Sequence, residues 1–218
     1  MVQALRYASA MTAIGLREQR RRALAEFHRE HLLDAAEAVF GDRGFQDATI
    51  KEIAERAEIS VGAVYGIVDG KEDLLAQTLA RRGTEFLAEM ERVIADADDP
   101  RATLHALADA QIGFFRRHPA FGRLWLRSAG PGRFGLSPAS LDRLGVNADR
   151  AMEMEADVIR RGQAARVVRA GDPVVLAALF SGIVQAYQAN DPASVGDGGA
   201  ERLALTDFHA VLEGAFTP

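Results

Sequence analysis

Two histidines, His28 and His31, lie three positions apart, a spacing that on a helix could present both imidazoles to one metal ion. The residue arrangement of a His-Glu-x-x-His metal helix is missing, and the other three histidines are isolated in the sequence. We therefore expect His28 and His31 to be exposed or to cap helix ends. The 218 residues include no cysteine, which excludes disulfides and thiolate chemistry.

Motifs for catalysis are not found elsewhere in the sequence. It has no Gly-x-Ser-x-Gly, no glycine-rich phosphate loop followed by Lys-Ser/Thr, and no dinucleotide fingerprint. Asp96, Asp98 and Asp99 stand beside Pro100 at a helix break, where carboxylates cap and solvate a helix end. The sequence therefore predicts no catalytic residue, no metal and no cofactor. A helical enzyme that binds a small molecule stays open as an alternative.

The segment from Thr49 to Tyr65 has the spacing of two short helices joined by a tight corner. Thr49 can cap the first helix, with Glu52 at the capping-box position. Ser60 can cap the second, whose outer side carries three small residues, Val61, Gly62 and Ala63. Two helices at a steep angle, with small side chains on the outer face of the second, fit a DNA major groove. The alternative is an ordinary helix pair.

The flanking residues extend this pattern over residues 32–75. A helix ending in Phe leads to a Gly-Phe corner, an Ala-Thr pair, an Ile-Ala pair, Ser-x-Gly, Tyr and Lys-Glu-x-Leu: Phe40, Gly44-Phe45, Ala48-Thr49, Ile53-Ala54, Ser60-Val61-Gly62, Tyr65 and Lys71-Glu72-Asp73-Leu74. This order resembles the N-terminal DNA-binding domain of the TetR family of bacterial transcriptional regulators. The chain departs from the family at Glu58, where glycine is usual, and at Ile67 and Val68, where His or Tyr and then Phe are usual.

The resemblance implies a role for each matching residue. Thr49, Tyr65 and Lys71 would bind backbone phosphates, Lys71 with the help of a helix N-terminus. Ser60 would cap the second helix, the one that enters the major groove. The small residues after Ser60 would contact thymine methyls and recognise groove shape. The residues expected at the DNA are Thr49, Lys51, Ser60, Val61, Gly62, Ala63, Tyr65, Gly66 and Lys71.

The charge of the chain limits how DNA could be bound. The formal net charge is −5, and residues 1–75 hold ten Lys or Arg against thirteen Asp or Glu. Cations must therefore be well placed rather than abundant. Arg17 and Arg20–Arg22 form a basic cluster that could reach along the backbone or into the minor groove. We predict a partly disordered arm at 1–25, a helix-turn-helix domain at 26–72, and a helical effector-binding and dimerisation domain at 73–218.

Beyond Lys71 the apolar residues keep helical spacing, and proline or glycine marks each break. Asp69 is expected to cap a long linking helix. Further helices are expected at about 101–117, 120–126, 138–162, 174–188 and 201–216, with loops at 130–135 and 190–199. No segment alternates at period two, so the predicted fold class is all-α. No apolar run reaches the ~18 residues that a membrane span requires.

The helix at 174–188 is apolar nearly all round, so it must be covered on more than one side. The resemblance implies that it pairs, with the last helix, against the same helices of a second subunit, giving a homodimer. A single domain that buries both helices is the alternative. The expected interface residues are Leu176, Leu179, Phe180, Ile183, Leu205, Phe208 and Leu212.

Large apolar residues, Phe134 among them, concentrate in the middle of the body, where the family holds an effector. Core packing is the alternative role for each of them. The expected ligand-binding residues are Phe114, Phe121, Trp125, Met152, Phe180 and Tyr187, with Gln111, Arg127, Gln185 and Asn190 as candidate polar contacts.

The combined hypothesis is a cytoplasmic, homodimeric regulator that binds a double-stranded DNA operator and a small-molecule effector. A repressor released by an apolar small molecule is the form that we favour. A ligand-independent regulator on the same fold is the second alternative.

Overall fold

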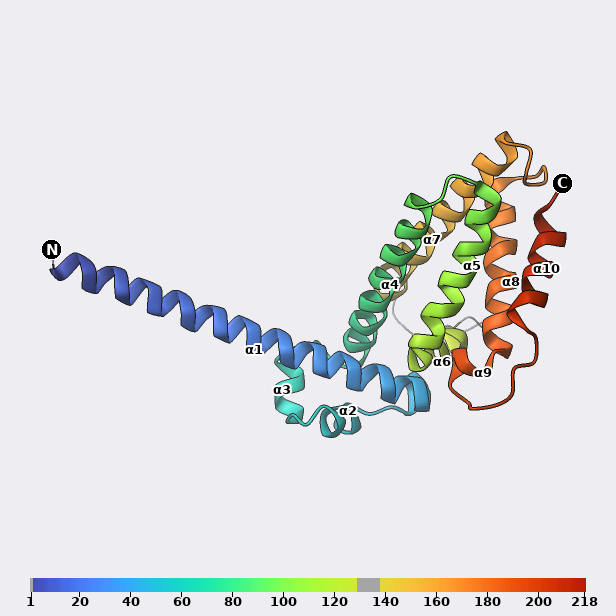
Figure 1. Ribbon diagram of the computed structural model, residues 1–218. Helices are drawn as coiled ribbons and strands as arrows, with labels where there is room; N and C mark the ends of the chain where they lie inside the picture. Colours follow the sequence, from blue (N-terminus) through green and yellow to red (C-terminus); the bar gives the residue numbers. More distant parts are fainter. Residues whose placement is uncertain (1, 129–137) are drawn as a thin grey trace.

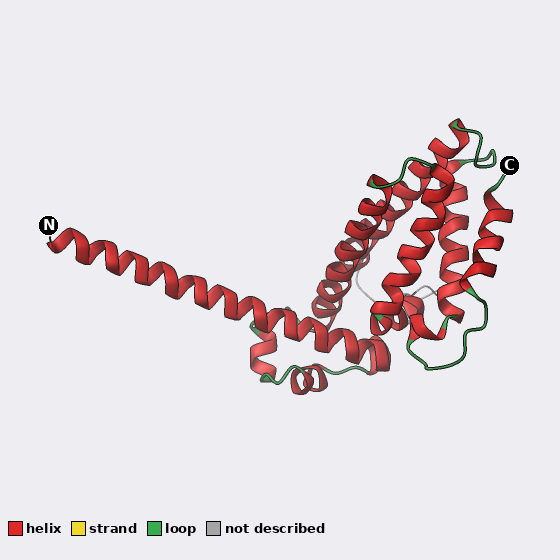
Figure 2. Ribbon diagram, in the orientation of Figure 1, coloured by secondary structure: helices red, strands yellow, loops and turns green. Residues whose placement is uncertain are grey.

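The computed structural model describes residues 2–128 and 138–218, with side-chain detail at 18–127 and 146–218. Every regular element in these ranges is a helix (Figure 2), as the sequence predicts. The helices are α1 (Val2–Asp47), α2 (Ile50–Arg56), α3 (Val61–Tyr65), α4 (Lys71–Ala95), α5 (Pro100–Arg117), α6 (Pro119–Ser128), α7 (Pro138–Ala164), α8 (Pro173–Asn190), α9 (Pro192–Val195) and α10 (Leu205–Phe216). The expected loop at 130–135 and Phe134 lie outside the described residues.

Local capping signals place the helix starts. The Thr49 hydroxyl accepts from the Glu52 backbone N–H at 3.2 Å, and the Glu52 carboxylate accepts from the Thr49 N–H at 3.1 Å. Ser60 Oγ accepts from the Ala63 N–H at 3.1 Å. These contacts confirm the predicted capping box of α2 and the predicted cap of α3.

The structure corrects other boundaries. Gly70, and not Asp69, is the N-cap of α4, and its φ of 97° lies where glycine is favoured. The Asp69 N–H instead donates to the Asp73 carboxylate at 3.0 Å. Helix α9 occupies part of the expected loop at 190–199, and α10 begins at Leu205 rather than near residue 201. The backbone of residues 2–25, the expected N-terminal arm, forms the first part of α1, and the expected domain bounds stay predictions.

Two apolar cores organise the molecule. The first joins α1, α2 and α3 to α4, α5 and α6, and its fully buried members include Leu32, Phe40, Ile53 and Leu74. The second fills the body between α4, α5, α7, α8 and α10. In Figure 1 the N-terminal part of α1 extends away from the body, and α2 and α3 lie against the C-terminal half of α1. The chain thus has an N-terminal helix-turn-helix domain and a C-terminal helical domain. Among the described residues, no helix has the length and apolarity of a membrane span.

Candidate DNA-binding head and effector cavity

Helix α3 exposes to solvent the face that carries its small residues. Val61 is 40% exposed and Tyr65 is 59% exposed, whereas Val64 on the opposite side is fully buried. The other predicted DNA contacts at the α2 and α3 ends are also exposed: Thr49, Lys51, Ser60, Gly62, Ala63 and Gly66. The packing of α3 therefore leaves free the same side chains that the sequence assigns to DNA.

The corner between α2 and α3 depends on an unusual backbone conformation. Glu58 has a φ of 56°, in the left-handed region that non-glycine residues rarely adopt. This conformation lets the Ile59 N–H donate to the Ala54 carbonyl at 3.0 Å and end α2. The departure at Glu58 thus preserves the corner that glycine usually forms, at a cost of about 1 kcal/mol.

The departures at Ile67 and Val68 have a packing role. Val68 is 4% exposed and belongs to the first core, and Ile67 is half-buried against the same core. Neither side chain can donate a hydrogen bond to a phosphate. Ile67 and Val68 therefore stabilise the packing of the DNA-binding head, the helix-turn-helix domain formed by α1, α2 and α3. Phosphate contacts must come from other residues.

Lys71 turns toward the protein instead of toward solvent. Its ammonium donates to the carbonyls of Gln46 at 3.1 Å and Ala48 at 3.0 Å, and it lies 4.7 Å from the centroid of the Phe45 ring. These contacts tie the start of α4 to the last turn of α1 and to the residue that follows it. This geometry favours a structural role for Lys71, and its predicted phosphate contact stays a prediction from the resemblance.

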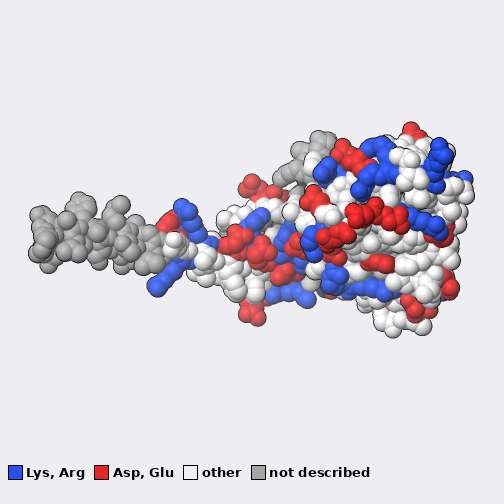
Figure 3. Space-filling model, turned by 45° about the horizontal axis from the view of Figure 1, so that its top comes forward, with Lys and Arg blue, Asp and Glu red and all other residues white. Residues whose placement is uncertain are grey.

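Cations around the head are partly matched by carboxylates. Glu18 bonds both Arg21 and Arg22 on α1, and Lys51 lies 3.8 Å from Glu55. The face in Figure 3 shows positive and negative side chains interspersed. His28 and His31 are both exposed, as predicted from the sequence, and lie on the same helix as the basic cluster.

A cavity of about 320 Å³ lies in the body between α4, α5, α6, α7 and α8. Its size and mainly apolar walls are those of a small-molecule site. Four aromatic side chains from three helices form one part of the lining: Phe86, Phe115, Phe121 and Trp125. The rings of Phe121 and Trp125 stack, with centroids 6.1 Å apart.

The predicted ligand-binding residues divide into two groups. Phe121, Trp125 and Met152 line the cavity, and so do the candidate polar contacts Gln111 and Gln185. Arg127 instead donates to the Asp42 carbonyl, and Asn190 donates to the Ala186 carbonyl.

Phe114, Phe180 and Tyr187 are outside the described lining of the cavity, and each packs elsewhere. Phe114 is buried in the first core, and Phe180 packs on Phe216 of α10. Tyr187 packs on the Phe208 ring, and its hydroxyl accepts from Arg116 at 3.2 Å. The apolar residues of α8 extend around most of the helix, so their spacing alone does not show that Phe180 and Tyr187 lie outside the cavity lining.

The cavity wall also contains a buried carboxyl group that was not predicted from the sequence. Glu155 of α7 is 2% exposed. Its Oε1 accepts from Gln111 Nε2 of α5 at 2.8 Å, and its Oε2 accepts from Ser181 Oγ of α8. Burial raises the pKa of Glu155 to about 7, although both hydrogen bonds oppose the shift. A signal was present, because Glu155 stands at helical spacing between Met152 and Ile159, on the apolar side of α7.

A second missed group lies further along α8. Gln188 is 3% exposed and lines the cavity, and its Nε2 has no hydrogen-bond partner among the described protein groups. Ser181, Gln185 and Gln188 recur at helical spacing, so they form a polar row on one side of α8. The cavity is therefore apolar with a polar row along one wall.

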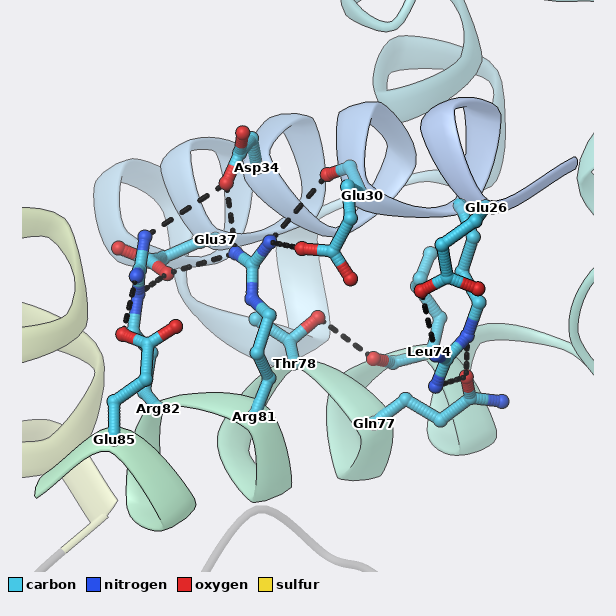
Figure 4. Close-up of polar contacts among 11 residues, drawn as sticks. Glu26, Glu30, Asp34, Glu37, Leu74, Gln77, Thr78, Arg81, Arg82 and Glu85 are labelled. Carbon is cyan, nitrogen blue, oxygen red and sulfur yellow. Dashed lines mark hydrogen bonds and ion pairs between the residues drawn. The ribbon is translucent and has the colours of Figure 1, made fainter. Parts of the chain in front are cut away.

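Helix α4 connects the cavity wall to the head through ion pairs (Figure 4). Arg81 bonds Glu30 and Asp34 of α1, each at 2.8 Å, and Arg82 bonds Glu37 at 2.6 Å. Both arginine side chains are mostly buried, and Glu37 is 6% exposed. The neighbouring α4 residues Leu79 and Gly83 line the cavity.

Helix α6 provides a second connection. Its Phe121 and Trp125 line the cavity, while its Arg123 pairs with Asp42 of α1. The two helices approach so closely that a Cβ on Gly41 would meet the Ala120 carbonyl oxygen at 2.5 Å. A displacement of α4 or α6 by a ligand would therefore move α1.

An exposed apolar face lies on α8 and α10. Val174, Val175, Leu179 and Val211 are each more than half exposed. Among the predicted interface residues, Leu179 belongs to this face, and Ile183 and Leu205 are half-buried.

The other four predicted interface residues, Leu176, Phe180, Phe208 and Leu212, are buried within the protomer. All four belong to the second core.

Comparisons with known proteins agree with this architecture. Residues 32–78 match the sequence model of bacterial regulatory proteins of the tetR family. The chain is 34% identical over 79 residues to the transcriptional repressor KstR2 of Rhodococcus jostii, a match that covers 36% of this chain and 39% of that protein. It is 30% identical over 81 residues to the nicotine-responsive repressor HdnoR of Paenarthrobacter nicotinovorans, covering 37% and 42%. The chain thus matches less than half of the length of each of these two relatives.

A solved structure extends the likeness to the whole fold. The fatty acid degradation regulator FadR of Bacillus halodurans superposes with a TM-score of 0.70 over 84% of this chain and 93% of that chain, at 14% identity. Residues 32–78 thus carry the helix-turn-helix domain of the tetR family of bacterial regulatory proteins, and the fold of the chain is that of this solved regulator. The relatives are named as regulators and not as enzymes.

Proposed function

We propose that this protein is a homodimeric repressor that leaves its DNA operator when a small, mainly apolar molecule enters the body cavity. The observation that carries the proposal is the shared use of α4 and α6. Each helix lines the cavity on one side and holds α1 of the DNA-binding head on the other. The name of one relative, a nicotine-responsive repressor, supports a ligand-controlled role.

The mechanism is a shift between two arrangements of the head. In a dimer, two α3 helices must be spaced to enter successive major grooves. A ligand that binds better to an arrangement with a different spacing weakens DNA binding by that difference in affinity. The ion pairs of Arg81 and Arg82 make α1 follow α4, so the head moves as a unit. A DNA-binding protein of this kind works in the cytoplasm.

The test is selection of binding sites from random duplex DNA with the purified protein. We expect an inverted repeat with two half-sites, because a two-fold dimer reads DNA symmetrically. Fluorescence anisotropy on the selected duplex then measures release by candidate ligands. Failure to enrich any sequence, with protein that is folded by circular dichroism, would refute the DNA-binding part. A selected site that no ligand of the cavity releases would favour a ligand-independent regulator.

A further inference from the structure

The described lining of the cavity can carry negative charge but not positive charge. Among the described lining residues, Glu155 is the one with an ionisable side chain. Gln111 on α5 and Ser181 on α8 bond its two oxygens, and the described α4 and α6 residues of the lining are apolar. Neither Lys nor Arg occurs in this described lining.

Two neutral hydrogen-bond donors offset only part of the free-energy cost of burying a carboxylate charge. Both oxygens of Glu155 already act as acceptors, so the group is arranged to bear negative charge. Apolar burial opposes ionisation of a carboxyl group that lacks a cationic partner. A positive ligand would supply that partner, whereas a carboxylate or phosphate ligand would add a second negative charge beside it.

The aromatic part of the lining suits the same ligand. Phe86, Phe115, Phe121 and Trp125 line the cavity together with Glu155. Faces of aromatic rings attract organic cations, and Trp does so most strongly. The remaining apolar walls would cover the hydrocarbon part of the ligand.

We propose that the effector is an organic cation, an apolar amine or quaternary ammonium compound, whose positive group pairs with Glu155. The proposal rests on the proposed function only in taking this cavity as the effector site. When such a cation binds to the protein with Glu155 protonated, the Glu155 proton leaves to solvent and the carboxylate pairs with the ligand.

The experiment compares three probes that share one alkyl chain: octyltrimethylammonium, 1-octanol and octanoate. Trp125, the single tryptophan of the chain, lines the cavity and reports binding by its fluorescence. We expect the cation to bind at least tenfold more tightly than the alcohol at pH 8, and octanoate to bind most weakly. Equal affinities, tighter binding of octanol or octanoate, or no binding of the cation at millimolar concentration would overturn the proposal.

The pH dependence gives a second readout on the unaltered protein. Cation affinity should fall about tenfold from pH 8 to pH 6, because Glu155 must lose its proton first. Calorimetry at pH 6 in buffers of different ionisation enthalpy should show release of about one proton per site. A pH-independent affinity without proton release would also overturn the proposal.

Matched variants assign the effect to one residue. Glu155→Gln should lower cation affinity at pH 8 at least tenfold, leave octanol affinity within twofold, and remove the pH dependence. Glu153→Gln, at an exposed position two residues earlier on α7, should behave as the unaltered protein. An unchanged cation affinity in a folded Glu155→Gln protein would refute the pairing.

The DNA assay separates this inference from the proposed function. A cation that binds through Glu155 without weakening operator binding would refute the release mechanism and leave the ligand class standing. Release of the operator by octanol or octanoate, unaffected by Glu155→Gln, would support the mechanism and refute the ligand class.

Discussion

At the scale of single residues, Lys71 is tied to the head by contacts that the sequence does not reveal. Its ammonium donates to two carbonyls, those of Gln46 and Ala48. Lys71→Met should therefore lower the free energy of unfolding by about 1–2 kcal/mol, measured by urea denaturation. The salt dependence of DNA binding should stay unchanged. Lys51→Met is the control, since the exposed Lys51 should lower the salt slope by about one when removed. A reduced salt slope for Lys71→Met would show that Lys71 does contact a phosphate.

Tyr65 is the exposed aromatic residue at the end of α3, with 59% of its surface accessible. Its hydroxyl is free to reach a DNA phosphate, as the family resemblance implies. Tyr65→Phe should weaken operator binding by about 1 kcal/mol for each head, measured by fluorescence anisotropy, and leave thermal stability unchanged. Tyr187→Phe is the matched control, because the Tyr187 hydroxyl bonds Arg116 in the body. Equal DNA affinities for Tyr65→Phe and the unaltered protein would remove Tyr65 from the contact set.

Glu155 should also make folding stability depend on pH. Its pKa in the folded protein is about 7, above the ordinary value of 4.5, because burial opposes ionisation. The folded state therefore holds a proton that the unfolded state releases, and stability falls as pH rises from 4.5 to 7. The loss should reach about 3 kcal/mol at pH 8. Comparing urea denaturation of the unaltered protein and Glu155→Gln over this range isolates the effect. Parallel stability curves would show that Glu155 ionises normally.

At the scale of helices, the α1–α4 ion pairs join head and body. Glu37 is 6% exposed and bonds Arg82 at 2.6 Å and Arg81 at 3.4 Å. Glu37→Ala leaves two mostly buried guanidinium groups with one carboxylate fewer, and we expect a loss of about 3 kcal/mol in unfolding free energy. Glu85→Ala is the control, since the more exposed Glu85 pair with Arg82 should contribute less than about 1 kcal/mol. Similar losses for both variants would mean that the α1–α4 contact is not dominated by this pair.

Local signals explain which helices the sequence could predict. Some helix starts depend only on residues within one turn, so they can be predicted from the local sequence. Examples are the caps at Thr49 and Ser60 and the proline at the start of α5. The lining of the cavity depends instead on which side of α8 meets α7, and the structure places Phe180 in the second core rather than in the described lining. The spacing places Glu155 on the apolar side of α7, but its partners Gln111 and Ser181 lie on α5 and α8 and cannot be identified from the local sequence. Such contacts between helices distant in sequence have no local signature.

At the scale of the whole molecule, the exposed face of α8 and α10 bears on both assembly and ligand binding. Val175, Leu179 and Gly182 follow helical spacing on its α8 part, and a Cβ on Gly182 would meet no atom within 4 Å. Gly182 also lines the cavity. A second copy packed on this face would bury the apolar side chains and cover part of the cavity wall, so dimerisation and ligand retention should be linked.

Leu179→Arg tests this link, because it places a charge in the middle of the face without touching the protomer core, Leu179 being 55% exposed. We expect sedimentation to show a dimer for the unaltered protein and a folded monomer for the variant at micromolar concentration. The monomer should bind the selected operator at least a hundredfold more weakly, since only one head would engage at a time. It should also release octyltrimethylammonium faster in stopped-flow Trp125 fluorescence. Glu91→Arg, at an exposed position on α4, should remain dimeric. A dimeric Leu179→Arg protein would place the interface elsewhere, and a monomer with an unchanged release rate would separate the cavity from the interface.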